Sequence, residues 1–271
     1  PIDTAFQPSH QRAAALMSQL EMIRGGTTTF IDIYRHPHEA ALVAEQSGLR
    51  AIFSPQVIDD PVEGPGETLE SNIRFVEEWG QRVPGRIFTW FGPHAPYSVK
   101  TETYRKMARL AEKYETGIHT HLCEVTSEVE DCLKKHGKTP VEYLDGLGVL
   151  GVKNFLGAHG VYLNNKDMQI LHKRGASIAH NPSSNMKMAA GVSPVPDLIQ
   201  AGVRVGLGTD SNLSNNNLDM FEEMRLAGML QKVTRMDPEV MPVEHLLRMA
   251  TNISAECLGL GDQVGSLEVG K

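Results

Sequence analysis

Short stretches of apolar, largely β-branched residues alternate with longer amphipathic segments along almost the whole chain. Each apolar stretch is hydrophobic on both faces and is followed by a polar or glycine-rich turn, as expected for strands buried in a parallel sheet. The amphipathic segments have the spacing of surface helices. The pattern predicts seven strands, at residues 27–33, 49–57, 86–91, 117–121, 155–159, 176–180 and 203–209.

Helical patterns precede the first predicted strand and lie between or after the others. Strand–helix alternation over more than 200 residues indicates an α/β barrel or a doubly wound sheet. No GxGxxG follows the first strand, so a dinucleotide-binding sheet has little support. The helical patterns cover residues 9–24, 38–47, 67–80, 101–115, 127–136, 165–174 and 217–232.

A closed (β/α)8 barrel of the TIM type has eight strands, and seven are visible in this sequence. Because an open barrel leaves an edge of unpaired backbone groups, we expect the eighth strand to lie before Pro1. The last residues, 265–271 (GSLEVGK), have the pattern of a turn that enters a strand. We therefore expect the chain to be cut at both ends from a longer product.

The amino-acid composition of the chain argues against a nucleic-acid or membrane partner. The 271 residues carry a net charge of −7 without a cluster of basic side chains, which argues against a nucleic-acid partner. No apolar run approaches the roughly 18 residues of a membrane span. Three cysteines (Cys123, Cys132 and Cys257) cannot all pair, and none has a CxxC spacing. We expect a reduced, cytoplasmic protein.

The ends of five successive predicted strands carry histidine or aspartate side chains, which are types that can bind metals. Catalytic groups of a (β/α)8 barrel project from the carboxyl ends of its strands. Neutral imidazole and carboxylate are the ligands of a catalytic zinc ion that keeps one position open for water. The sequence therefore predicts a metal-dependent hydrolase. The residues at or directly after the strand ends are His94, His119 with His121, His159, His180 and Asp210.

Several of these residues have an alternative role. His119 and His121 share a face of their strand, so both could bind one metal, although we favour His119 as a packed core histidine. Asp210 could cap the helix that follows it. Glu124, three residues after His121, could be a first-turn glutamate, but a catalytic role fits its position better. The role of His180 stays open.

A second histidine pair competes for a metal. His36-Pro37-His38 follows the first predicted strand, and two histidines one residue apart can chelate an ion. The proline between them and the helix predicted from His38 favour a structural loop instead.

Four segments resemble the amidohydrolase superfamily: HTHLCEV, AHGVYL, AHNPSSNMKMAAGVSPV and GLGTDSNLSNNNLDMFEEMRLAGMLQK. Within it, the sequence is similar to the 5′-methylthioadenosine/S-adenosylhomocysteine deaminases, from GGTTTF through PHAPYS to GSLEVGK. The resemblance implies a barrel over residues 1–263 that lacks its first strand. It also implies that residues 264–271 begin the C-terminal part of a small β-sandwich, most of which is absent.

The resemblance assigns roles to four of the strand-end residues. His121 is similar to the metal-ligand histidine of the fifth barrel strand, and Asp210 to the eighth-strand aspartate that binds the metal and takes a proton from water. Glu124 resembles the glutamate that moves a proton to the purine ring nitrogen. His159 resembles the histidine that polarises the attacking water or the developing oxyanion.

The resemblance further implies how substrate and metal bind. His94 is similar to a histidine on the ribose side of the substrate, and Asp3 stands where relatives have a glutamate that binds the ribose hydroxyls. One divalent ion is implied, zinc or, as the alternative, Fe2+. The family's metal-binding HxH on the first strand would lie before Pro1, and His36 with His38 does not match it. A purine nucleoside substrate and a homo-oligomer are also implied.

Other functions use the same machinery. A guanine deaminase or a triazine hydrolase would share the metal site and differ in its loops. Because the first-strand HxH is absent, the chain could also be a catalytically incomplete piece of the deaminase. Three arginines are candidates to bind a carboxylate on the ribose substituent, with no motif to choose among them: Arg74, Arg82 and Arg86.

Overall fold

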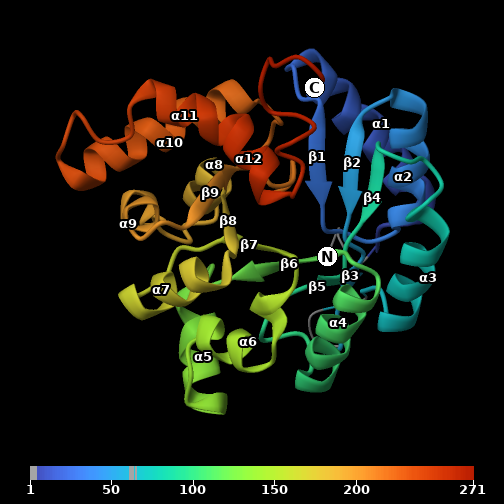
Figure 1. The fold of residues 1–271 in the computed structure, drawn as a ribbon, viewed down its shortest axis with the longest axis horizontal. Helices are drawn as coiled ribbons and strands as arrows, with labels where there is room; N and C mark the ends of the chain where they lie inside the picture. Colours follow the sequence, from blue (N-terminus) through green and yellow to red (C-terminus); the bar gives the residue numbers. More distant parts are fainter. Residues whose placement is uncertain (1–4, 61–63, 65) are drawn as a thin grey trace. The chain divides into compact units, whose positions relative to one another are not determined.

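The computed structural model describes residues 5–60, 64 and 66–271, and it consists of two compact units (Figure 1). The first comprises residues 1–120 and the second residues 121–271, so the division falls within strand β6 (Gly117–Leu122). Among the described residues, no helix combines the length and the apolar character that crossing a membrane requires.

The first unit contains two small sheets with helices in the connections. Strands β1, β2 and β4 form one sheet with parallel pairing, from Thr29 opposite Arg50 onward, and β3 pairs in parallel with β5. The elements are α1 (Pro8–Arg24), β1 (Thr29–Asp32), α2 (Pro37–Ser47), β2 (Arg50–Phe53), β3 (Gln56–Val57), α3 (Leu69–Trp79), β4 (Ile87–Thr89), β5 (Gly92–Pro93) and α4 (Thr101–Lys113).

Small and aromatic side chains build the core of this unit. The alanines of α2 are buried against Phe53, Phe75 and Trp79. Alanine lets a helix backbone approach closely, and the aromatic rings fill the space that remains. Each ring pair adds edge or stacking contacts, such as the stacked pair of Phe75 and Trp79 with ring centroids 5.9 Å apart.

One predicted strand, residues 49–57, is divided in two. Pro55 has no N–H to donate to a ladder, so pairing stops after Phe53 and resumes at Gln56. The chain opposite comes very close at this break, because a Cβ atom on Gly92 would lie 2.5 Å from the carbonyl oxygen of Ser54. Glycine is therefore required there.

The second unit is built on one sheet whose strands follow the chain order β6-β7-β8-β9, with parallel pairing from β7 to β9. Helices lie between the strands and after the last one. The elements after β6 are α5 (Thr126–His136), α6 (Pro140–Gly146), a 3-10 turn η3 (Val149–Gly151), β7 (Asn154–His159), α7 (Asn165–Arg174), β8 (Ser177–His180), α8 (Pro182–Lys187), α9 (Val195–Gln200), β9 (Arg204–Leu207), α10 (Met220–Arg235), α11 (Val243–Ala250) and α12 (Asn252–Cys257).

All seven predicted strands and all seven predicted helices are present, with ends shifted by a few residues. The structure adds β5 and five helices, α6, α8, α9, α11 and α12, of at most eight residues each. Helices this short complete about two turns, too few for a 3.6-residue period to stand out. For residues 265–271, predicted as a turn that enters a strand, the strand is wrong: the segment consists of bends, a turn and irregular residues.

Candidate active site

The predicted metal and catalytic residues of the second unit gather at one edge of its sheet. His121 lies near the end of β6, His159 ends β7 and His180 ends β8, whereas Asp210 follows β9. These four strands are neighbours in this order (Figure 1). Strand-end side chains that are far apart in the sequence are therefore brought together.

His159 is the centre of this group. Its ring is buried, and its Nδ1 lies 2.9 Å from the Oδ1 atom of Asn185. Because that oxygen accepts, Nδ1 carries a proton and donates it to Asn185, and this bond fixes the orientation of the ring. Nε2 lies 3.7 Å from a carboxylate oxygen of Glu124. The ring also stacks on that of His121, with centroids 5.5 Å apart.

Asp210 is held as an ionised carboxylate. The hydroxyl of Ser184 donates to its Oδ2 at 2.6 Å, and the N–H of Ser211 donates to its Oδ1 at 2.7 Å. Burial alone would raise the pKa of Asp210, but the charges of His159 and His121 and these hydrogen bonds lower it below the usual value. The alternative role as a helix cap is wrong, because Asp219 is the residue that caps α10.

Glu124 does not lie in the first turn of a helix, so the alternative role for it is wrong as well. Helix α5 begins at Thr126, after the N-cap residue Val125. The Glu124 side chain is 23% exposed, and its carboxylate points at His159. Its position before the helix leaves it available for proton transfer.

A second glutamate, Glu128, lies four residues after Glu124 in α5, and the sequence analysis missed it. Glu128 is buried, and its two carboxylate oxygens accept the N–H groups of Cys123 at 2.8 Å and of Glu124 at 2.9 Å. Burial raises its pKa to about 7, against the opposing effect of those two hydrogen bonds. A glutamate three residues into a helix is a common capping residue, so the sequence alone does not single it out.

The short helix α8 supports both His159 and Asp210. It carries Asn185, which bonds His159, and Ser184, which bonds Asp210. Buried Glu223 of α10 holds α8 in turn, because its carboxylate accepts the N–H of Ser183 at 3.3 Å. The motif NPSSN was the available signal for this helix, but nothing in the motif assigns its serine and asparagine to particular partners.

The two remaining strand-end histidines are buried. His119 is 5% exposed in the first unit, as expected of a packed core histidine. His180 is fully buried, and neither of its ring nitrogens has a hydrogen-bond partner among the described residues. Burial, reinforced by the charge of His159, lowers the pKa of His180 to about 3, so its ring is neutral.

Of the predicted substrate-binding residues, Glu124 and Asp210 belong to the second unit and His94 to the first. His94 Nδ1 lies 2.7 Å from the hydroxyl of Ser98, and its ring meets Tyr97 edge-on with centroids 5.7 Å apart. These contacts fix the orientation of the ring. Asp3 lies outside the described residues.

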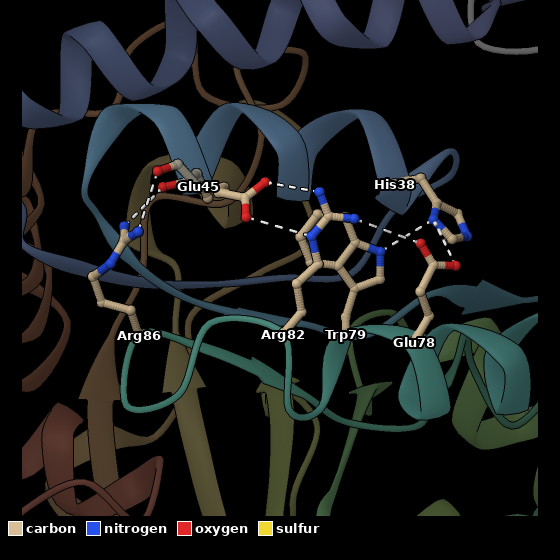
Figure 2. Close-up of polar contacts among 7 residues, drawn as sticks. His38, Glu45, Glu78, Trp79, Arg82 and Arg86 are labelled. Atoms are coloured by element: carbon tan, nitrogen blue, oxygen red, sulfur yellow. Dashed lines mark hydrogen bonds and ion pairs between the residues drawn. The ribbon is translucent and has the colours of Figure 1, made fainter.

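The rival pair His36 and His38 has other partners. His36 is the N-cap of α2, and its ring Nε2 lies 3.3 Å from the carbonyl oxygen of Phe6. His38 Nδ1 accepts the indole N–H of Trp79 at 3.1 Å, a contact visible in Figure 2. The two rings serve the packing around α2, as the structural interpretation expected.

Two of the three candidate arginines are also engaged within the first unit (Figure 2). Arg82 forms a two-pronged ion pair with Glu45, at 3.0 and 3.4 Å, and lies over the ring of Trp79. Arg86 donates to three backbone carbonyls at the end of α2 and just beyond it. These contacts make both arginines structural, and Arg74 keeps no assigned role.

The side chains at this edge of the sheet are of the types that bind zinc. His121 and Asp210 offer an imidazole and an ionised carboxylate, which are ligands of catalytic zinc. Within residues 5–60, 64 and 66–271, however, no three His, Cys, Asp or Glu side chains are arranged to hold a metal ion. The described residues therefore fit part of a zinc ligand set.

Parallel strands with candidate metal-binding and proton-transfer residues at their carboxyl ends are typical of (β/α)8-barrel enzymes, and the comparison with known families identifies the class. The model of the amidohydrolase family matches residues 4–271, so the chain belongs to this family. This match also confirms the predicted (β/α)8 fold class.

Several relatives are named as deaminases of adenine nucleosides. The chain is 40% identical to a 5-methylthioadenosine/S-adenosylhomocysteine deaminase of Syntrophomonas wolfei over 270 residues, which are 100% of this chain and 62% of that protein. It is 40% identical over 272 residues to a 5′-deoxyadenosine deaminase of Methanobrevibacter smithii, with the same coverage. The crystal structure of an adenosine deaminase from Xanthomonas campestris with bound zinc matches with a TM-score of 0.93 and 33% identity, over 100% of this chain and 62% of that one. The chain thus spans less than two thirds of the length of these relatives.

Proposed function

We propose that this chain carries the catalytic residues of a metal-dependent deaminase that hydrolyses the amino group of an adenine nucleoside, such as S-adenosylhomocysteine or 5′-methylthioadenosine. The observation that carries the proposal is the contact of 3.7 Å between the Glu124 carboxylate and Nε2 of His159, beside the ionised Asp210. The names of the relatives support the substrate class.

His121 and Asp210 are the residues of this chain that would hold the ion, which we propose to be zinc. The ion supplies Lewis acidity, which makes a water molecule acidic enough to lose a proton near pH 7. The resemblance places the other ligands on a strand that is not part of this sequence.

The side chains divide the proton transfers among them. Asp210 accepts a proton from the attacking water, whose oxygen bonds to the amino-bearing ring carbon. Glu124 donates a proton to the adjacent ring nitrogen, so the ring does not accumulate negative charge. His159, whose ring is held by Asn185 through Nδ1, polarises the attacking water or the developing oxyanion through Nε2. The proton taken up by Asp210 then passes to the amino group, the carbon–nitrogen bond breaks and ammonia leaves, while the hydroxyl proton returns to Glu124, so that the ring keeps the oxygen as a carbonyl.

Substrate recognition and assembly complete the proposal. His94 would contact the ribose side and Asp3 the ribose hydroxyls. Residues 1–263 would belong to the barrel and residues 264–271 to the small β-sandwich. A cytoplasmic homo-oligomer without a nucleic-acid or membrane partner remains our expectation for the whole protein.

Ammonia release from a panel of adenine nucleosides, guanine and aminated triazines tests the reaction. We expect adenine nucleosides to be hydrolysed. Glu124→Gln should lower kcat by about 10²- to 10⁴-fold with the bound metal retained. Glu130→Gln, a change at an exposed glutamate of α5, is the matched control and should leave kcat unchanged. Full turnover in the Glu124 variant, or hydrolysis of guanine or triazines alone, would overturn the proposal.

A zinc titration shows whether residues 1–271 hold the metal by themselves or are a catalytically incomplete piece of the deaminase. Because we assign the ion to His121 and Asp210 within this chain, we expect weak zinc binding by residues 1–271 alone and tight binding, near one ion, by the longer protein. Asp210→Asn should reduce both metal content and activity there. A fully active Asp210→Asn protein would remove this residue from the ligand set.

A further inference from the structure

The turn between β6 and α5 has an unfavourable backbone conformation at a residue other than glycine. Cys123 has φ of 52°, in the left-handed region, which is unfavourable for a residue that carries a side chain. Such a conformation persists only where the surroundings fix it. Because Glu124 is the next residue, the conformation of this turn sets the direction in which its carboxylate points.

Contacts on both sides fix the turn. From the α5 side, the buried carboxylate of Glu128 accepts the successive N–H groups of Cys123 and Glu124, at 2.8 and 2.9 Å. From the β7 side, the carbonyl of Cys123 accepts the N–H groups of Val161 at 3.0 Å and Tyr162 at 2.9 Å. The turn is therefore tied to the segment that directly follows His159.

The pattern differs from ordinary helix capping. Glu128 is the third residue of α5, where a capping glutamate bonds the N–H of the N-cap residue. Its carboxylate instead reaches past the N-cap, Val125, to the two residues before it. Glu142 occupies the same position in α6 and does bond its N-cap residue, Thr139, at 3.0 Å. Glu142 is therefore a matched control, a capping glutamate without a link to Glu124.

We propose that Glu128 is a positioning residue for Glu124: its buried carboxylate clamps the two amides of the turn and so holds the Glu124 carboxylate against His159. The inference rests on the proposed role of Glu124 in proton transfer. A misplacement of about 1 Å lowers the rate of such a step about 10²-fold. Glu128 has no direct contact with the reacting atoms in this role.

The Glu128→Gln protein, with its metal, tests this positioning. Glutamine keeps one acceptor and turns an N–H donor toward the second amide. We expect kcat to fall about 10²-fold with KM changed less than about threefold, and Glu142→Gln to leave both unchanged. In the double variant with Glu124→Gln, the loss should equal that of Glu124→Gln alone, because Glu128 acts through Glu124. Losses that multiply would overturn the proposal.

Amide hydrogen exchange gives a readout that does not depend on activity. The N–H groups of Cys123 and Glu124 should exchange slowly in the wild-type and Glu142→Gln proteins and much faster in Glu128→Gln. Unchanged exchange would overturn the proposal. If Glu128→Gln does not fold, Glu128→Asp, one methylene too short to span both amides, takes its place. If the longer, zinc-loaded wild-type protein hydrolyses none of the substrates, the proposed function fails, and the exchange measurement still decides whether Glu128 holds the turn.

Discussion

Arg86 offers a test of whether the arginines near α3 serve the fold or the substrate. It lies in the turn before β4, and its guanidinium donates to the carbonyls of Ala44 at 3.0 Å, Glu45 at 3.1 Å and Leu49 at 3.3 Å. Two of these carbonyls belong to the last turn of α2, whose end carries partial negative charge. We therefore expect Arg86→Gln to destabilise the first unit.

The size of the effect follows from these bonds. A hydrogen bond from a charged donor contributes about 1.5–3 kcal/mol, and losses from one side chain are less than additive. We expect the free energy of unfolding to fall by about 2–4 kcal/mol. Arg82→Gln is the control: its pair with Glu45 is about a third exposed on each side, and such a surface pair contributes about 1 kcal/mol or less.

Urea unfolding of the two variants measures the difference, and substrate kinetics give the second readout. We expect KM to remain within about twofold of the wild-type value for Arg86→Gln, because its donors are all engaged in the fold. A loss of stability no larger than that of Arg82→Gln would refute the structural role. A large rise in KM without a loss of stability would instead return Arg86 to the substrate site.

Three further predictions concern single side chains. Asn185→Ala removes the acceptor that fixes the His159 ring, so kcat should fall about 10- to 100-fold, and undiminished turnover would contradict this role. Because both side chains are buried, urea unfolding should also show a loss of about 1–3 kcal/mol in the free energy of unfolding. The pKa of His180 is about 3 in the folded protein, below its ordinary value of 6.5, so the stability that this residue contributes is present above pH 6.5 and is lost as the pH falls. Between pH 7 and pH 5, the free energy of unfolding should therefore fall by about 2 kcal/mol more in the wild type than in His180→Met. An equal fall in the two proteins would contradict the burial argument. Gly92→Ala should lower the melting temperature by several degrees, since its Cβ would lie 2.5 Å from the Ser54 carbonyl oxygen, and an unchanged melting temperature would show that the strands can separate at no cost.

Part of the site was predictable because catalytic residues of a (β/α)8 barrel recur at strand ends. His121, His159 and Asp210 were found in this way, and the structure brings all three to one sheet edge. The supporting residues were not predictable. Asn185 is 26 residues away from His159 in the sequence, and nothing in its local pattern indicates this partner.

Within short segments, the sequence by itself determined which residues form strands and longer helices, because burial on one or both faces produces a hydrophobic period that can be counted. It also determined the kind of chemistry, since imidazole and carboxylate at strand ends suit few reactions. Only the tertiary structure decided how these groups are oriented. Glu128 became a clamp rather than a cap, and Arg86 a support for α2 rather than a substrate ligand, because hydrogen-bond partners are chosen by proximity in space, which sequence spacing does not encode.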